Sequence, residues 1–193
     1  MRLFVALEIP EPVRREVSEW AATLCPELPR ARWVRAESLH LTLVFLGEVE
    51  RAALDRLTEG LAGASTGSGP IELSIEGGGT FPPHRPARVA WLGVHGVSPG
   101  DLLRLEALKS RLDAASAAAV GFSPESRPFH PHLTLARPAV PWPRSSAERF
   151  EAAARRRFGA PFALGSAVLM ESELGPGGAR YRMVERFGLG AAS

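Results

Sequence analysis

The four-residue string HLTL occurs twice in the chain, at 40–43 and at 132–135. Side chains alternate between the two faces of an extended strand, so each copy would present a histidine and a threonine on one face and two leucines on the other. A core would require the leucines but would leave the opposite positions free to vary. The polar pair is what repeats, so His40, Thr42, His132 and Thr134 are the first candidate site residues.

Two histidines without an obvious nucleophile suit general acid and base catalysis. Near neutral pH, one imidazole can be neutral and accept a proton while the other is charged and donates one. If a pseudo-twofold axis relates the two strands, the imidazoles face each other with a hydroxyl beside each. Displacement at phosphorus needs a base on one side, an acid on the other, and donors for the remaining oxygens. We therefore predict a phosphoryl-transfer site that uses no metal and no cofactor.

A metal site is the main alternative for the same histidines. His130 would share a strand face with His132, so His130, His132 and His40 could offer three nitrogen ligands to zinc. The sequence near the motifs offers no obvious acidic residue as a further ligand or as a hydrogen-bond partner of one, and a metal would leave both threonines unexplained. Acid–base catalysis is the better interpretation of the four motif residues.

Length and composition are those of a globular protein. The chain has 193 residues, of which 45% are hydrophobic and 23% charged, enough for one compact unit with a buried core. No apolar run approaches the roughly 20 residues of a membrane span. The opening MRLFVALEIP lacks the basic start and cleavage site of a signal peptide, and the single cysteine, Cys25, cannot form an internal disulfide. We expect a cytoplasmic protein.

The positive charge is a weak indication of a nucleic-acid partner. The net charge is +2 and the pI about 9.3, but almost all the basic residues are arginine, which the composition of the coding DNA can explain. Arg127 and Arg137 are the best candidates for phosphate contacts, because a guanidinium is a charged, forked donor. Strict alternation would turn Arg137 away from the face of His132, so its use requires the strand to end or twist first. His130 would support His132 or begin the strand.

Other aromatic and basic residues are expected to have ordinary structural roles. Phe45 falls on the leucine face by the same alternation, which predicts a core residue and not a platform for a nucleobase. Aromatic residues in strands are more often core than ligands, which applies to Trp33, Trp91 and Tyr181. His84, in a loop with Arg85, could touch RNA but is more simply a solvated loop residue.

Periodicity predicts strands and helices in mixed order. Apolar runs indicate strands at 2–9, 31–36, 39–47, 71–77, 87–94, 132–135, 162–172 and 179–187, the last two forming a hairpin. Helical spacing indicates helices at 11–25, 50–62, 100–115 and 145–158. Mixed order with hairpins predicts an α+β fold with antiparallel sheets, and the repeated motif suggests two pseudo-equivalent lobes in one domain.

The motifs and their flanks resemble the 2H phosphoesterase superfamily, whose signature is a pair of His-x-Thr/Ser-hydrophobic motifs. Within it, the chain is most similar to the RNA 2′,3′-cyclic phosphodiesterases, also named 2′-5′ RNA ligases. The resemblance spans nearly the whole chain and rests on RLFVALEIP, LHLTLVFLGEV, RPFHPHLTLARP and ESELGPGGARYRMVERF.

This resemblance implies a bilobal fold over residues 1–193, with two antiparallel sheets that flank a central cleft, helices on the outside and pseudo-twofold symmetry. It also implies metal-independent hydrolysis of RNA 2′,3′-cyclic phosphate ends to a 2′-phosphate, with weak 2′-5′ ligation in reverse. By the resemblance, His40 would protonate the leaving 3′ oxygen and His132 would activate the water. Thr42 and Thr134 would hydrogen-bond the non-bridging oxygens.

Two other functions fit the same motifs. The chain could be a non-catalytic module that holds an RNA end, although a pure binder has no need for a paired acid and base. It could also be a phosphodiesterase of a small cyclic nucleotide. RNA ends are the expected partner, with no membrane, no obligate protein partner and a monomeric state.

Overall fold

The computed structural model describes residues 1–83, 86–175 and 178–191. His84 and Arg85, considered above for RNA contact, lie outside the described residues, as does the tip of the expected C-terminal hairpin at 176–177. The strands are β1 (Arg2–Glu8), β2 (Ala31–Trp33), β3 (His40–Glu48), β4 (Ile71–Phe81), β5 (Val89–Gly96), β6 (His132–Pro138), β7 (Arg157–Leu164), β8 (Ser166–Gly175) and β9 (Gly178–Gly188). The helices are α1 (Glu11–Leu24), α2 (Leu54–Ser65), α3 (Pro99–Val120) and α4 (Arg144–Ala153), with 3-10 turns η1 (Cys25–Glu27), η2 (Ala36–Ser38) and η3 (Arg51–Ala53).

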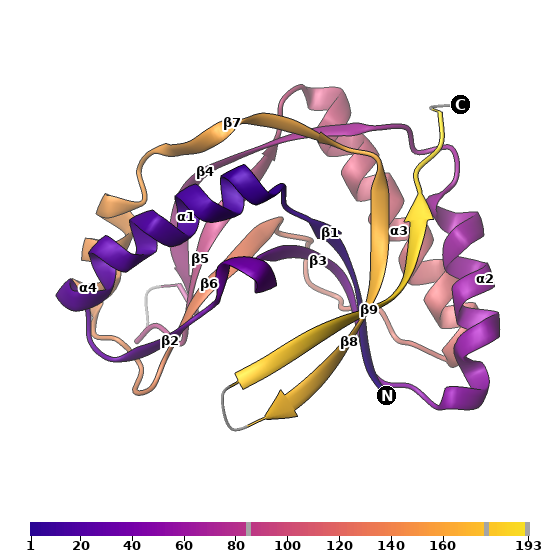
Figure 1. Cartoon of the computed structure of the whole chain (residues 1–193), viewed down its shortest axis with the longest axis horizontal. Helices are drawn as coiled ribbons and strands as arrows, with labels where there is room; N and C mark the ends of the chain where they lie inside the picture. Colours follow the sequence, from indigo (N-terminus) through magenta and orange to yellow (C-terminus); the bar gives the residue numbers. More distant parts are fainter. Residues whose placement is uncertain (84–85, 176–177, 192–193) are drawn as a thin grey trace.

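All strands belong to one curled antiparallel sheet in the order β7-β4-β5-β6-β3-β1-β8-β9, with β2 paired to β6 (Figure 1). The α+β class is confirmed. In place of the two expected sheets there is one sheet with two halves, β7-β4-β5-β6 and β3-β1-β8-β9. A single residue pair, Leu41 with Leu133, joins β3 to β6 and so connects the halves. Each half contributes one HLTL strand to this junction.

The two halves are not consecutive pieces of the chain. An earlier unit of the chain contains β1, α1, β3, α2 and β4 in this order. A later unit contains β5, α3, β6, α4, β7 and β8 in this order. β4 pairs with β5 of the later unit, whereas β8 pairs with β1 of the earlier unit. The two units therefore exchange strands, and each half of the sheet is completed by the other unit.

The expected strand at 162–172 is in fact two strands that meet at Gly165. β7 pairs with β4 in one half, and β8 pairs with β1 in the other half. Only Gly165 separates the two strands, so the chain passes from one half of the sheet to the other over this one residue. A continuous apolar run shows that a segment is buried, but it does not show that the segment changes pairing partners.

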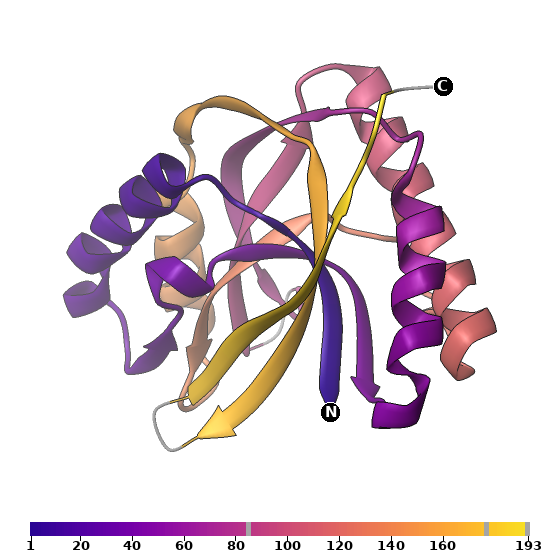
Figure 2. The same ribbon diagram turned by 45° about the vertical axis from the view of Figure 1, so that its right-hand side comes forward.

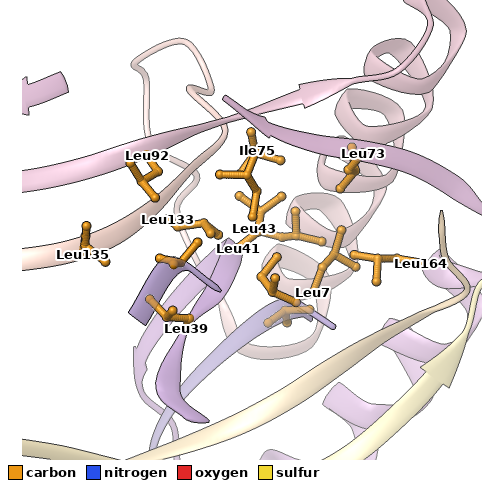
Figure 3. Packing of buried hydrophobic residues seen from close by; sticks show 14 of the residues in the cluster. Leu7, Leu39, Leu41, Leu43, Leu73, Ile75, Leu92, Leu133, Leu135 and Leu164 are labelled. Carbon is orange, nitrogen blue, oxygen red and sulfur yellow. The ribbon is translucent and has the colours of Figure 1, made fainter. Parts of the chain in front are cut away.

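The leucines of both motifs lie in one core. Leu41, Leu43, Leu133 and Leu135 are at most 3% exposed and pack with apolar residues of β1, β4, β5 and β7 (Figure 3). The opposite face of β1 and β8 carries a small separate cluster of Phe4, Ala6, Val168 and Met170. We call this opposite face, which also carries His40, the motif face.

In β3, a β-bulge follows the motif threonine. Thr42 pairs with Ala6 and Val44 pairs with Val5, so Leu43 has no partner on β1. Leu43 and Val44 are consecutive yet both buried. One extra residue reverses the alternation of faces beyond it.

In β6, the same bulge occurs at the same place in the motif. Thr134 pairs with Trp91 and Ala136 pairs with Ala90, so Leu135 has no partner on β5. Leu135 and Ala136 are likewise consecutive and buried. The two motif strands therefore share their sequence, their bulge and their junction, as a pseudo-twofold relation requires.

The helices lie in two groups at the sides of the sheet. α1 and α4 lie together at one side, and α2 packs against α3 at the other (Figures 1 and 2). Helix α3 is longer than predicted because its alanine-rich end favours helix as far as Gly121, whose φ of +66° ends it. None of the helices in the described ranges is long and apolar enough to cross a membrane.

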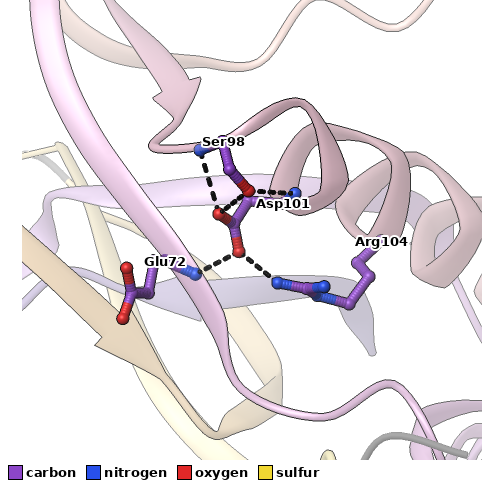
Figure 4. Close-up of polar contacts among 4 residues, drawn as sticks. All are labelled: Glu72, Ser98, Asp101 and Arg104. Carbon is purple, nitrogen blue, oxygen red and sulfur yellow. Dashed lines mark hydrogen bonds and ion pairs between the residues drawn. The ribbon is translucent and has the colours of Figure 1, made fainter.

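The start of α3 is tied to β4 by a buried carboxylate. Asp101 is 3% exposed and accepts hydrogen bonds from the Ser98 backbone N–H, the Ser98 hydroxyl, the Glu72 backbone N–H and the Arg104 guanidinium (Figure 4). The Ser98 hydroxyl in turn accepts from the Asp101 N–H, completing a capping box. The hydrogen bond from Ser98 is the largest cause that lowers the pKa of Asp101 to about 2.

Candidate functional site

The two imidazoles are held in the same way in both halves. Nδ1 of His40 lies 2.7 Å from the carbonyl oxygen of Ser38, and Nδ1 of His132 lies 2.7 Å from the carbonyl oxygen of His130. A carbonyl oxygen only accepts, so Nδ1 carries a proton in each ring. Nε2 is then the nitrogen that remains to give or take a proton, and both rings have it available.

Two aromatic rings fix the position of His40. The ring centroid of Phe4 lies 4.8 Å from that of His40, and Tyr181 meets His40 edge-on at 5.1 Å. Phe4 and Tyr181 also contact each other at 5.0 Å. Because Phe4 comes from β1 and Tyr181 from β9, three strands of one half together limit the rotation of this imidazole.

His132 has an equivalent aromatic support from the other half. Phe81 and Trp91 meet its ring edge-on at 5.3 and 6.1 Å, and they stack on each other at 5.1 Å. Trp91 lies across Gly79 of β4, where any Cβ would collide with the indole ring. A side chain at this position would therefore displace the indole that supports His132.

His130 contributes to the site through both its backbone and its ring. Its carbonyl oxygen orients His132, as described above, and its ring meets Trp91 edge-on at 4.7 Å. His130 and Trp91 also border an open cavity of about 670 Å³ that extends along β5 to the start of α3. The structure thus places His130 beside His132, and its role in the site stays a prediction.

Burial and neighbouring charges favour the neutral form of both histidines. Burial lowers the pKa of His40, and the charge of His132 lowers it further, against a hydrogen bond to Ser38 that raises it. Burial also lowers the pKa of His132, and the charges of His130 and Arg137 add to this, against the hydrogen bond to the His130 carbonyl. The two imidazoles are thus close enough for the charge on one to affect the other.

The threonine hydroxyls are available to a ligand. Thr42 and Thr134 are half-buried, and within the described ranges neither hydroxyl has a hydrogen-bond partner. The register pairs Thr42 with Ala6 and Thr134 with Trp91, both on the motif face. Two imidazoles and two free hydroxyls therefore share this face at the junction of the halves.

The β-bulges decide which residues follow the motifs on this face. Arg137 is exposed on the motif face, because the bulge at Leu135 reverses the alternation, and its charge reaches His132. Phe45 is at the corresponding place in β3, five residues after His40. It pairs with Phe4 and is 48% exposed.

The prediction that Phe45 is a core residue is therefore wrong. Strict alternation puts Phe45 with the leucines, but the bulge at Leu43 turns it to the motif face. The guanidinium of Arg2 lies over its ring, 5.1 Å from the centroid. The equal spacing of Phe45 and Arg137 from their histidines was the signal in the sequence that pointed to this relation.

Two further residues considered in the sequence, Arg127 and Trp33, lie in a loop and on the core, respectively. Arg127 lies in an irregular loop, pairs with Glu125 at 3.0 Å and is 83% exposed, with no hydrogen bond or ion pair to the motif residues in the described part of the chain. Trp33 packs on the core beside Trp142, as expected of a strand aromatic.

The metal alternative finds no support in the geometry. His130 and His132 have ring centroids 6.3 Å apart. Over residues 1–83, 86–175 and 178–191, no three His, Cys, Asp or Glu side chains are grouped as metal ligands.

A model of the family described as LigT-like phosphoesterase matches residues 7–91 and again residues 98–181. Each match contains one HLTL motif. The chain belongs to the LigT-like phosphoesterase family. The resemblance inferred from the motifs is confirmed, and this LigT-like chain is a phosphoesterase, a hydrolase of phosphate esters.

Relatives match between 69% and 98% of this LigT-like chain. An RNA 2′,3′-cyclic phosphodiesterase of Methanothermobacter thermautotrophicus is 32% identical over 189 residues, which cover 98% of this chain and 99% of that protein. One of the same name from Geobacillus stearothermophilus is also 32% identical, but the 134 matched residues cover 69% of this chain and only 41% of the longer relative.

Solved structures show the same LigT-like fold. TT0787 of Thermus thermophilus is 31% identical, with a TM-score of 0.77 and 98% of each chain covered. E. coli LigT complexed with 3′-AMP is 29% identical, with a TM-score of 0.70 and 97% of each chain covered.

Proposed function

We propose that this chain hydrolyses the 2′,3′-cyclic phosphate at RNA ends to a 2′-phosphate, with His40 and His132 as acid and base. The observation that carries the proposal is the pair of identically held imidazoles, each with Nδ1–H bound to a carbonyl and Nε2 left for proton exchange. RNA as the substrate is supported by the name that the relatives share.

In the proposed reaction, Nε2 of His132 takes a proton from water as its oxygen bonds to phosphorus. Nε2–H of His40 gives a proton to the 3′ oxygen as the P–O3′ bond breaks. The products are a 2′-phosphate and a 3′-hydroxyl, and the histidines return to their starting states through solvent. Arg137 and His130 beside His132 favour its neutral form, the form in which it can accept a proton.

The hydroxyls of Thr42 and Thr134 would donate to the two non-bridging oxygens of the phosphate. Their lack of described partners leaves them available. Charge on these oxygens grows as the fifth bond to phosphorus forms, so donors already in place stabilise the transition state more than the ground state.

Phe45 would stack on the base of the terminal nucleotide. Its ring is exposed on the motif face, next to Phe4 and under the Arg2 guanidinium. Every nucleobase has a π-face, so this contact would add affinity without selecting a sequence.

The same residues would also catalyse ligation. With the 5′-hydroxyl of a second RNA in place of water, His132 would again take the proton of the nucleophile and His40 would again protonate the 3′ oxygen as the P–O3′ bond breaks, so that a 2′-5′ bond joins the two RNAs. Water competes for the same position, so ligation is expected to be weak.

Hydrolysis of an RNA oligonucleotide with a 2′,3′-cyclic phosphate end, in EDTA, tests the proposal. We expect turnover by the wild type to a 2′-phosphate, and a loss of about 100-fold or more in kcat for His40→Ala and for His132→Ala. An Arg155→Ala control removes an exposed charge just after α4 and should retain wild-type activity.

Other results would favour other functions. An inactive wild type that binds the RNA would indicate a non-catalytic RNA-end module. Activity on nucleoside 2′,3′-cyclic phosphates alone would indicate a small-molecule phosphodiesterase. Activity lost in EDTA and restored by zinc would contradict the two-histidine mechanism.

A further inference from the structure

Two arginines lie side by side on neighbouring strands next to the site. Arg32 of β2 and Arg137 of β6 are direct partners in the antiparallel register (Figure 1 shows β2 beside β6). Directly opposed residues in such a pair have Cβ atoms about 4.5–5.5 Å apart, and like charges in this position are unfavourable. An anion between them would remove that cost.

No described residue neutralises this pair. Arg32 and Arg137 are both exposed, and neither makes a hydrogen bond or an ion pair within residues 1–83, 86–175 and 178–191. Elsewhere arginines in strands do pair with carboxylates across strands, as Arg157 does with Glu76 and Arg182 with Glu171. Within the described residues, the two opposed arginines thus differ from Arg157 and Arg182 in having no acidic partner.

The pair lies on the motif face. The next register pair, Trp33 with Ala136, is directed to the core, where Ala136 is fully buried and Trp33 packs beside Trp142. Alternation therefore places Arg32 and Arg137 on the opposite face, with His132 and Thr134. The charge of Arg137 also lowers the pKa of His132, which agrees with its place on this face.

We propose that Arg32 and Arg137 together form a second phosphate subsite, which holds the phosphodiester that links the terminal nucleotide to the rest of the RNA. This inference rests on the proposed function, because it requires the cyclic phosphate to lie between the two histidines. Two guanidiniums present forked donors that match a phosphodiester. Arg32 then makes the enzyme prefer an oligonucleotide to a mononucleotide, because only the oligonucleotide has this phosphodiester.

The test compares adenosine 2′,3′-cyclic phosphate with the dinucleotide ApA ending in a 2′,3′-cyclic phosphate. We expect Arg32→Ala to lower kcat/KM for the dinucleotide about tenfold more than for the mononucleotide, through KM and not kcat. The salt dependence of log KM for the dinucleotide should decrease by about 0.7 in slope, for one lost phosphate contact to a single strand. Arg32→Lys should restore much of the loss.

Arg155→Ala serves as the matched control, since it removes an exposed arginine without a described partner at a site away from the motif face. It should leave the ratio of the two substrates as in the wild type. If Arg32→Ala affects both substrates equally, or neither, the phosphate subsite is refuted while the proposed function stands. If the wild type hydrolyses neither substrate, the proposed function itself fails, and the inference with it.

Discussion

Phe45 and Arg137 both follow a motif histidine by five residues, yet one is aromatic and the other cationic. The bulges place both side chains on the motif face at corresponding positions of the two halves. An aromatic ring suits a nucleobase and a guanidinium suits a phosphate. If the chain acts on RNA ends as proposed, this single difference gives the nearly symmetric site a direction in which RNA can bind.

Replacing Phe45 tests this role. Phe45→Ala should raise KM for adenosine 2′,3′-cyclic phosphate about tenfold with little change in kcat, because stacking on one base contributes about 1–3 kcal/mol. Phe45→Tyr should retain the wild-type KM. Val140→Ala, which shortens an apolar side chain that is 74% exposed, is the control for general surface effects. Equal KM values for wild type and Phe45→Ala would exclude stacking.

The sequence predicts the strand faces of the motif residues correctly and those of their neighbours poorly, for one physical reason. Alternation over four residues is enough to put His40 and Thr42 on one face and the leucines on the other. Beyond the second leucine, the outcome depends on a bulge, which is set by how two strands pair and leaves no local pattern in either strand. The position of Phe45 was therefore predicted wrongly, and the face of Arg137 could not be decided.

At the scale of elements, the network at Asp101 fixes α3 to β4. Asp101→Asn keeps the shape of the side chain but removes the charge that accepts from Ser98, Arg104 and the Glu72 N–H. We expect a loss of about 1–2 kcal/mol in the free energy of unfolding at pH 7, measured by urea denaturation. Glu106→Gln removes an exposed charge from the same helix and should cost little.

The pH dependence of this loss follows from the lowered pKa of Asp101. A carboxylate with a folded-state pKa of about 2 and an unfolded value near 4 contributes fully above about pH 4. The contribution disappears as the pH falls through 2. The difference between wild type and Asp101→Asn should therefore shrink between pH 4 and pH 2, and a difference constant across that range would contradict the assignment.

Other elements show where local sequence patterns stop being informative. The three residues of β2 hold a position beside β6 that no periodicity over 31–36 indicates, because the partner lies about a hundred residues later. The split of β7 from β8 at Gly165 is likewise a matter of pairing between distant strands. The position of β2 bears on the proposed phosphate subsite, because β2 carries Arg32.

At the scale of the whole molecule, the exchange of strands between the two units predicts a single cooperative domain. β4 and β8 each complete the half of the sheet that belongs to the other unit, so neither half can keep its core if the other unfolds. We propose that urea unfolding is one transition, with coincident midpoints by tryptophan fluorescence and far-UV circular dichroism. Two separated transitions would show that the halves are independent lobes.

The pseudo-twofold arrangement also explains why the motif is repeated. Each HLTL strand supplies one imidazole, one hydroxyl and two core leucines, and the pair Leu41–Leu133 brings the strands together. The two matches of the family model divide the chain in the same way, with one motif in each. The proposed reaction needs both an acid and a base, and the fold presents a histidine twice.

The pH dependence of kcat/KM for a cyclic-phosphate RNA, measured in EDTA, tests the two-histidine mechanism most directly. The wild type should give a bell-shaped profile with its maximum below about pH 6.5, since the pKa values of both histidines are lowered in the free enzyme. His132→Gln should lose the rising acid limb, and His40→Gln the falling alkaline limb. Profiles that keep both limbs in both variants would contradict the account.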